Sequence, residues 1–122
     1  MKRPTGTKTY DLEDRSLEFA RRCRSLVKQL PTTTANSEDG KQLVRASGSV
    51  GANYIEANEA LSKKDFLHRL RISRKEAKES RYWLRLLDIG GDQALESQRA
   101  ALVAESAELL SILSAIIQKA SA

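Results

Sequence analysis

The chain has little sulfur, few aromatic rings and few residues that break regular structure. Its 122 residues include one cysteine, one histidine and two prolines, and 5% of them are aromatic. A single cysteine, Cys23, excludes an intramolecular disulfide and a zinc site built from several thiolates. No apolar stretch follows the basic residues near the N-terminus, so we expect no secretory signal peptide. Together these absences favour a reduced, cytoplasmic compartment.

The chain also lacks the residue spacings that support catalysis or cofactor binding. His68 has no second ligand at a metal-binding spacing, and Gly48 to Gly51 has neither the preceding strand nor the pattern of a phosphate-binding loop. No apolar run approaches the ~18 residues of a membrane span. We therefore predict no catalytic residue, no metal, no cofactor and no membrane partner. An enzyme that uses Glu56 or Glu79 is the least favoured alternative.

What the chain does contain is abundant helix-forming residues with apolar side chains at helical spacing. In residues 11–30 the inward positions step by four and three, which is typical of an amphipathic helix. Pro31 ends this helix. The expected seam consists of Leu12, Ser16, Phe19, Cys23, Leu26 and Leu30.

A second helix is expected from Asn36 or Ser37 to about Ala60. Glu38 and Asp39 would then lie in its first turn, where the helix dipole favours acidic side chains. The residues before Asn36 are expected to form a loop.

Two further helices follow, each with a recognisable cap. Ser62 with Asp65 three residues later resembles a capping box and begins a helix that runs to Leu87. Asp92 is the expected N-cap of a last helix that runs to about Lys119. Their seams are Phe66, Leu70, Ser73, Ala77, Ser80, Leu84 and Leu87, and then Leu95, Leu102, Leu109, Leu113 and Ile116.

Four amphipathic helices joined by short connections predict an all-α fold, an up-down-up-down antiparallel four-helix bundle. We assign residues 10–119 to this single domain and residues 1–9 to a polar N-terminal tail.

The second helix is unusually thin and polar. Gly48 and Gly51 each cost about 1 kcal/mol relative to alanine in mid-helix, and the expected compensation is close approach by another helix; a locally weak or kinked helix is the alternative. We interpret its polar side chains as a structural hydrogen-bonded network, since buried polar groups must be paired; a functional site is the alternative. The network comprises Gln42, Arg45, Ser49, Asn53 and Glu56, with Glu76 and Glu79 of the third helix as partners for Arg45 or Asn53.

Positive charge is concentrated on the third helix. Residues 63–87 hold nine basic and three acidic side chains, a net charge of +6, so the rest of the chain carries −1. Cations in a row give affinity for phosphates with little base specificity; a solvated helix face is the alternative. The basic stripe, the candidate nucleic-acid site, consists of Lys64, Arg71, Arg74, Lys75, Lys78, Arg81 and Arg85.

A third side of the same helix carries Ile72, Trp83 and Leu86. A helix in a monomeric bundle needs one buried face, so this apolar flank predicts contacts between subunits. A closed ring of subunits would repeat the basic stripe around its surface.

The second and third helices carry the pattern of a known family. The matching segments are Gln42–Ala46, Ser49–Asn53 and Glu56–Ala57, followed by Lys64–Phe66, Ile72, Lys75–Ala77, Glu79 and Tyr82–Leu87. Over roughly residues 10–118 the chain resembles the four-helix-bundle family named for the 23S rRNA intervening sequence protein. The resemblance implies a homopentamer. A related branch, the accessory variability determinant of diversity-generating retroelements, is a basic pentamer that binds nucleic acid and partners a reverse transcriptase.

The function that we predict is a non-enzymatic, homo-oligomeric bundle that binds RNA or DNA through the basic stripe. The alternative is a protein-interaction scaffold whose basic face docks an acidic protein partner.

Overall fold

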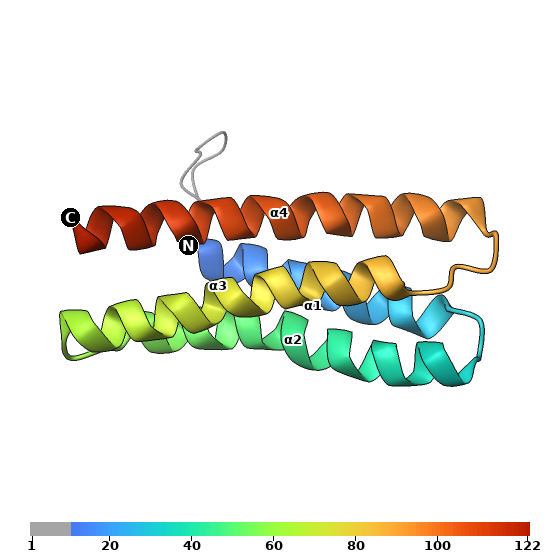
Figure 1. Ribbon diagram of the computed structural model, residues 1–122, viewed down its shortest axis with the longest axis horizontal. Coiled ribbons are helices and arrows are strands. Elements are labelled where there is room, and N and C mark those ends of the chain that lie inside the picture. Colours follow the sequence, from blue (N-terminus) through green and yellow to red (C-terminus); the bar gives the residue numbers. More distant parts are fainter. Residues whose placement is uncertain (1–10) are drawn as a thin grey trace, which may run out of the picture.

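The computed structural model describes residues 11–122, so the predicted tail at residues 1–9 lies outside the described part of the chain. The described residues form four helices and no strand: α1 (Leu12–Gln29), α2 (Thr34–Asn58), α3 (Lys63–Leu86) and α4 (Gln93–Ser121). The helices run antiparallel in an up-down-up-down order (Figure 1). Each helix packs on the next, and α1 also packs on α4, which closes the bundle. The predicted all-α four-helix bundle is confirmed.

A side-chain oxygen caps the start of every helix. The predicted caps at Ser62 and Asp92 are both present: Ser62 accepts from the backbone N–H of Asp65 and Asp92 from that of Leu95. Asp11 and Thr33 cap α1 and α2 in the same way. Each cap satisfies an N–H group that has no partner inside the helix.

The start of α2 differs from the prediction. The helix begins at Thr34, so Asn36 lies inside it, and Glu38 and Asp39 fall outside its first turn. The buried Asn36 amide donates to the carbonyl oxygens of Pro31 and Asp88, and its oxygen accepts from the N–H of Asp88, all at 2.9 Å. Asn36 therefore links the α1–α2 turn to the α3–α4 turn. Because asparagine is common in loops, the sequence alone does not reveal this tertiary role.

The core follows the predicted seams, except that two seam residues are only half-buried and the last position on α4 is displaced by one residue. The seam side chains of α1 are buried, with Leu30 half-buried at the end, and those of α3 are buried except Phe66, which is half-buried. On α4 the last buried residue is Ile117, whereas Ile116 is half-buried. The final step after Leu113 is therefore four residues rather than three.

The thin surface of α2 faces α1. A Cβ added at Gly51 would lie 2.7 Å from Ser16 Oγ, and one at Gly40 would lie 3.1 Å from a methyl group of Val27. At Gly51 this confirms the close approach predicted for the middle of α2. At Gly48 the prediction is not confirmed, because the nearest atom is a guanidinium nitrogen of the flexible Arg24 side chain at 3.3 Å.

One helix of the described chain, α4, is long and apolar enough to cross a membrane by length and composition. Its most apolar 18-residue window has a mean hydropathy of 1.8, and 28% of that window is buried. The prediction that no apolar stretch approaches a membrane span does not hold for α4 by this criterion. Its leucine seam packs into the bundle core, as expected of a core helix in a bundle.

Candidate nucleic-acid interface

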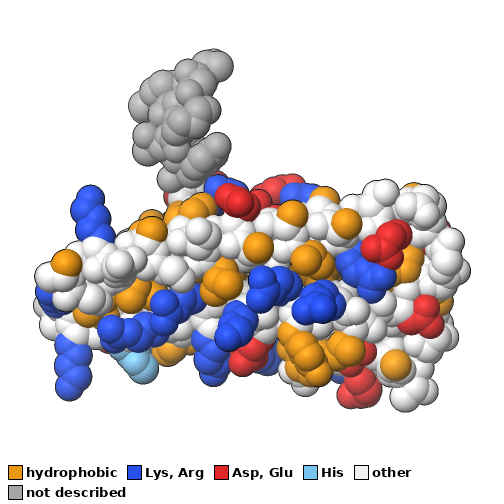
Figure 2. Space-filling model, turned by 45° about the horizontal axis from the view of Figure 1, so that its top comes forward, with side chains coloured by type: hydrophobic (Ala, Val, Ile, Leu, Met, Phe, Trp, Pro, Cys, Tyr) orange, Lys and Arg blue, Asp and Glu red, His pale blue; other side chains and the backbone are white. Residues whose placement is uncertain are grey.

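The basic stripe lies on the outside of the bundle because the opposite face of α3 is fully packed. Leu70, Ala77 and Leu84 are completely buried, and Ser73 and Ser80 lie between them with their hydroxyl groups bonded to carbonyl oxygens. On the other side of the helix, Lys and Arg side chains form a row along one face of the molecule (Figure 2). The exposed members are Lys64, Arg71, Lys75, Lys78 and Arg85, and the half-buried members are Arg74 and Arg81.

The charge of the stripe is not neutralised within the described chain. The ion pairs in residues 11–122 join Arg15 to Glu105, Lys41 to Glu38, Arg99 to Glu96, and Arg45 to Glu76 and Glu79. None of these pairs involves a stripe residue. The structure thus places the seven predicted residues on one side of α3, none of them in an ion pair among the described residues.

Tyr82 lies on the same face, and the stripe as predicted did not include it. Its side chain is 57% exposed. Its ring contacts that of Trp83 edge to face, with centroids 5.2 Å apart and an interplanar angle of 75°. At 100° per residue, Tyr82 falls about 40° from Lys78 and about 20° from Lys75. A helical projection that included aromatic residues would have placed it in the stripe.

The polar network is present in part. One guanidinium nitrogen of Arg45 lies 3.5 Å from a carboxylate oxygen of Glu76 and 3.5 Å from one of Glu79, so the proposed pairing occurs. Asn53 donates to Ser49 Oγ at 2.9 Å and accepts from Arg69 at 3.4 Å.

Three members of the polar network are exposed to solvent in the single chain. Gln42, Arg45 and Glu56 are exposed, whereas the Glu76 carboxylate is 7% exposed. Arg45 therefore partly neutralises the buried Glu76 carboxylate from the surface. The polar network does not form a closed internal layer within one chain.

The groups that could carry nucleophilic or metal chemistry are placed apart. Burial raises the pKa of the Cys23 thiol from 9.0 to about 12, and a hydrogen bond with Ser47 opposes that rise. His68 is exposed on α3. Within residues 11–122, no three His, Cys, Asp or Glu side chains lie close enough together to hold a metal ion.

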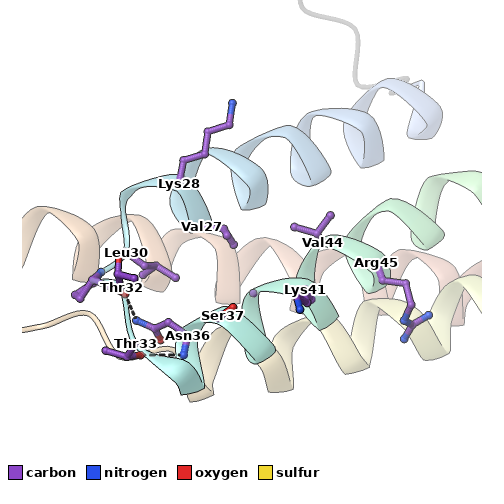
Figure 3. Close-up of a pocket in the computed structure, with 12 residues that line it drawn as sticks. Val27, Lys28, Leu30, Thr32, Thr33, Asn36, Ser37, Lys41, Val44 and Arg45 are labelled. Carbon is purple, nitrogen blue, oxygen red and sulfur yellow. Dashed lines mark hydrogen bonds between the residues drawn. The ribbon is translucent and has the colours of Figure 1, made fainter.

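A pocket of about 580 Å³ lies beside the α1–α2 turn (Figure 3). Val27, Leu30 and Val44 contribute its apolar wall, and Lys28 and Arg45 stand at its edges. Asn36 also lines the pocket, and its amide is already bonded within the turns. None of the basic stripe lines this pocket.

The family is decided by comparison of the sequence with known families. A family model described as 23S rRNA-intervening sequence protein matches residues 8–115. The chain belongs to this family. No curated protein matches the chain.

A solved structure supports the family and the fold together. A protein of unknown function from the S23 ribosomal protein family of Bacteroides thetaiotaomicron VPI-5482 is 36% identical to the chain. The two superpose with a TM-score of 0.73, and the match covers 87% of this chain and 97% of that one. The resemblance predicted from α2 and α3 is confirmed, and the pattern that carries it includes the residues of the polar network and part of the basic stripe.

Proposed function

We propose that this family member is a non-enzymatic, homo-oligomeric bundle that binds RNA or DNA phosphates through the basic stripe of α3. The observation that carries the proposal is the row of seven cations with no ion-pair partner among the described residues. A protein that neutralises several phosphates with Lys and Arg gains affinity from counterion release, with little dependence on sequence. The description of the family in terms of 23S rRNA agrees with a nucleic-acid partner.

The proposed oligomer rests on apolar surface that one chain leaves uncovered. Leu86 is 47% exposed beside Trp83, and the buried indole N–H of Trp83 has no acceptor among the described residues. A second subunit would cover the Leu86 side chain and would supply an acceptor for the indole N–H of Trp83. The outward side of α4, rich in alanine, offers further surface for such contacts. By family resemblance we propose a pentamer, which would repeat the stripe around a ring.

A charge reversal tests the binding site. The variant Arg71→Glu, Lys75→Glu, Lys78→Glu would be titrated against a structured RNA and a duplex DNA by fluorescence anisotropy at several salt concentrations. Wild type should bind with a steep salt dependence, and the variant should lose that affinity while its circular dichroism stays helical. A wild type that binds neither probe at low salt would overturn the proposal.

A matched control is available on the opposite side of the bundle. α1 does not pack on α3, and Arg21, Arg22 and Lys28 on α1 are all exposed. Reversing these three changes the net charge by the same amount and should leave most of the affinity. Equal losses in both variants would show that total charge, and not the stripe, controls binding.

The alternative, an acidic protein partner on the same face, would give salt-sensitive binding as well. Nucleic acid that copurifies without nuclease treatment, seen in the ultraviolet absorbance ratio, favours the proposal over this alternative.

A further inference from the structure

The basic stripe contains an exposed aromatic ring, Tyr82, which lies about 20° inside the edge marked by Lys75. Tyr82 follows Lys78 by one helical turn and precedes Arg85 by three residues. Along the helix axis these cations lie about 6 Å before and about 4.5 Å after it. Their side chains are exposed, so two free cations flank the ring on one surface.

The contact with Trp83 restricts the orientation of the Tyr82 ring. It rests edge to face against Trp83, which packs partly against the core. The adjoining residues Ser80 and Leu84 are completely buried, so the backbone beneath Tyr82 belongs to a packed helix. An aromatic ring presented in this way loses little side-chain freedom when a ligand stacks on it.

We propose that the stripe binds unpaired nucleotides, with one base stacked on Tyr82 and its neighbouring phosphates held by Lys78 and Arg85. This inference rests on the proposed function and specifies the class of nucleic acid. Positively charged grooves that carry aromatic rings bind single strands because every base has a face that can stack. In a duplex both faces of each base are already covered by its neighbours, so a duplex would use only the cations.

A second copy of the chain is a poorer occupant of this surface. In a ring, a contact centred on Tyr82 would remove Lys78 and Arg85 from water, which costs free energy unless each is paired. In a two-fold contact the cations of both copies would also meet, and like charges across an interface cost free energy. The apolar flank formed by Ile72, Trp83 and Leu86 begins about 40° round the helix from Tyr82, at Leu86. A subunit contact on that flank would leave Lys78 and Arg85, about 80° and 100° from Leu86, outside it.

The test separates the base from the phosphates. Full-length protein would be titrated with a short oligodeoxyadenylate, with an abasic strand of the same phosphate number and with the corresponding duplex. Wild type should bind the base-bearing strand at least about 5-fold more tightly than the abasic strand. Tyr82→Ala should remove that preference, and Tyr82→Phe should retain it. A 2-aminopurine placed in the strand should be quenched by wild type and not by Tyr82→Ala.

The outcomes distinguish this inference from the proposed function. An unchanged base preference in Tyr82→Ala, or equal binding of the base-bearing and abasic strands by wild type, overturns the stacking role, while loss of binding on charge reversal still supports the phosphate site. A change of oligomeric mass in Tyr82→Ala, measured by light scattering, would place the ring in a subunit contact and overturns the inference. Wild type that binds no probe, or binds only an acidic polypeptide, ends both proposals.

Discussion

The inward and outward faces of α3 are built from opposite kinds of side chain. On the inward face every polar group is satisfied: Ser73 donates to the Val50 carbonyl at 2.7 Å, and Ser80 donates to the Glu76 carbonyl at 2.8 Å. On the outward face the cations form no ion pair among the described residues, and Tyr82 is open to solvent. The contrast indicates that one face is specified for folding and the other for an external partner.

The largest effect should come from a cavity on the inward face. Leu84 is completely buried, and Leu84→Ala should lower the free energy of unfolding by about 2–5 kcal/mol, because it removes transfer free energy and leaves a void. Its neighbour Arg85 is exposed, and Arg85→Ala should change that free energy by less than about 0.5 kcal/mol. Urea denaturation measures both. Similar losses in the two variants would mean that the two faces do not differ as described.

The interior should also respond to alkaline pH through Cys23. Its pKa rises from 9.0 to about 12 on burial, so the fold favours the neutral thiol. The resulting stabilisation is complete below pH 9 and is lost as pH rises toward 12, because the unfolded chain ionises first. Between pH 8 and pH 10 this group should lower the free energy of unfolding by about 1.4 kcal/mol.

Alkaline pH affects other interactions in the protein as well, so the measurement needs Cys23→Ala as a reference. This variant loses some packing at both pH values but lacks the thiol, and its stability should therefore fall less between pH 8 and pH 10. The difference between the two slopes isolates Cys23. Parallel slopes would show that the thiol ionises equally in the folded and unfolded chain.

A smaller effect is expected where α1 approaches α2. Gly51→Ala would place a Cβ 2.7 Å from Ser16 Oγ, which is itself bonded to the Glu13 carbonyl, and should destabilise the fold by about 1 kcal/mol despite the better helix propensity of alanine. At Gly48 the nearest atom is the guanidinium end of Arg24 at 3.3 Å, which can move aside. Gly48→Ala should thus stabilise by up to about 1 kcal/mol. Thermal unfolding of both variants gives the signs, and matching signs would refute the close-approach argument.

The sequence predicted the elements of this fold well because helical periodicity and caps are local signals. Ser62 and Asp92 each precede an apolar run at the right spacing, and both cap helices. Asn36 was missed because its partners lie in the backbone of distant segments, Pro31 and Asp88. A side chain that bridges two turns leaves no periodic mark, so the start of α2 was placed two or three residues late.

The candidate site was predictable in its charge but not in its full composition. The seven cations lie on one face, as helical geometry requires once Leu70, Ala77 and Leu84 point inward. The polar network was harder to predict, because residue type does not say which polar side chains stay exposed: Gln42 and Glu56 are exposed, whereas Glu76 is buried. Which of these side chains an assembly would bury depends on contacts between subunits, and residue type does not reveal those contacts.

The smallest effect is the most direct test of what the outward face is for. Lys78 has Arg74, Lys75 and Arg81 one turn away on α3 and no acidic residue at those spacings. Like charges at these spacings destabilise a helix by about 0.2–0.5 kcal/mol per pair. Lys78→Gln, which keeps a good helix former, should therefore stabilise the fold by a few tenths of a kcal/mol at low salt. At about 1 M salt the gain in stability should vanish, because the Debye length is then only about 3 Å and the repulsion between the cations is screened.

The matched variant for that measurement is Lys119→Gln, because Lys119 has no charged residue one turn before it and lies near the C-terminus of α4, where the helix dipole favours a cation. It should give no gain in stability at any salt concentration. On a helix face that only contacts solvent, the repulsion among Arg74, Lys75, Lys78 and Arg81 would be offset by no other interaction. If Lys78→Gln raises the melting temperature and also weakens nucleic-acid binding, the stripe sacrifices local stability for an external anion. If it lowers the melting temperature, the cations are neutralised within the assembly and the contrast between the two faces of α3 fails.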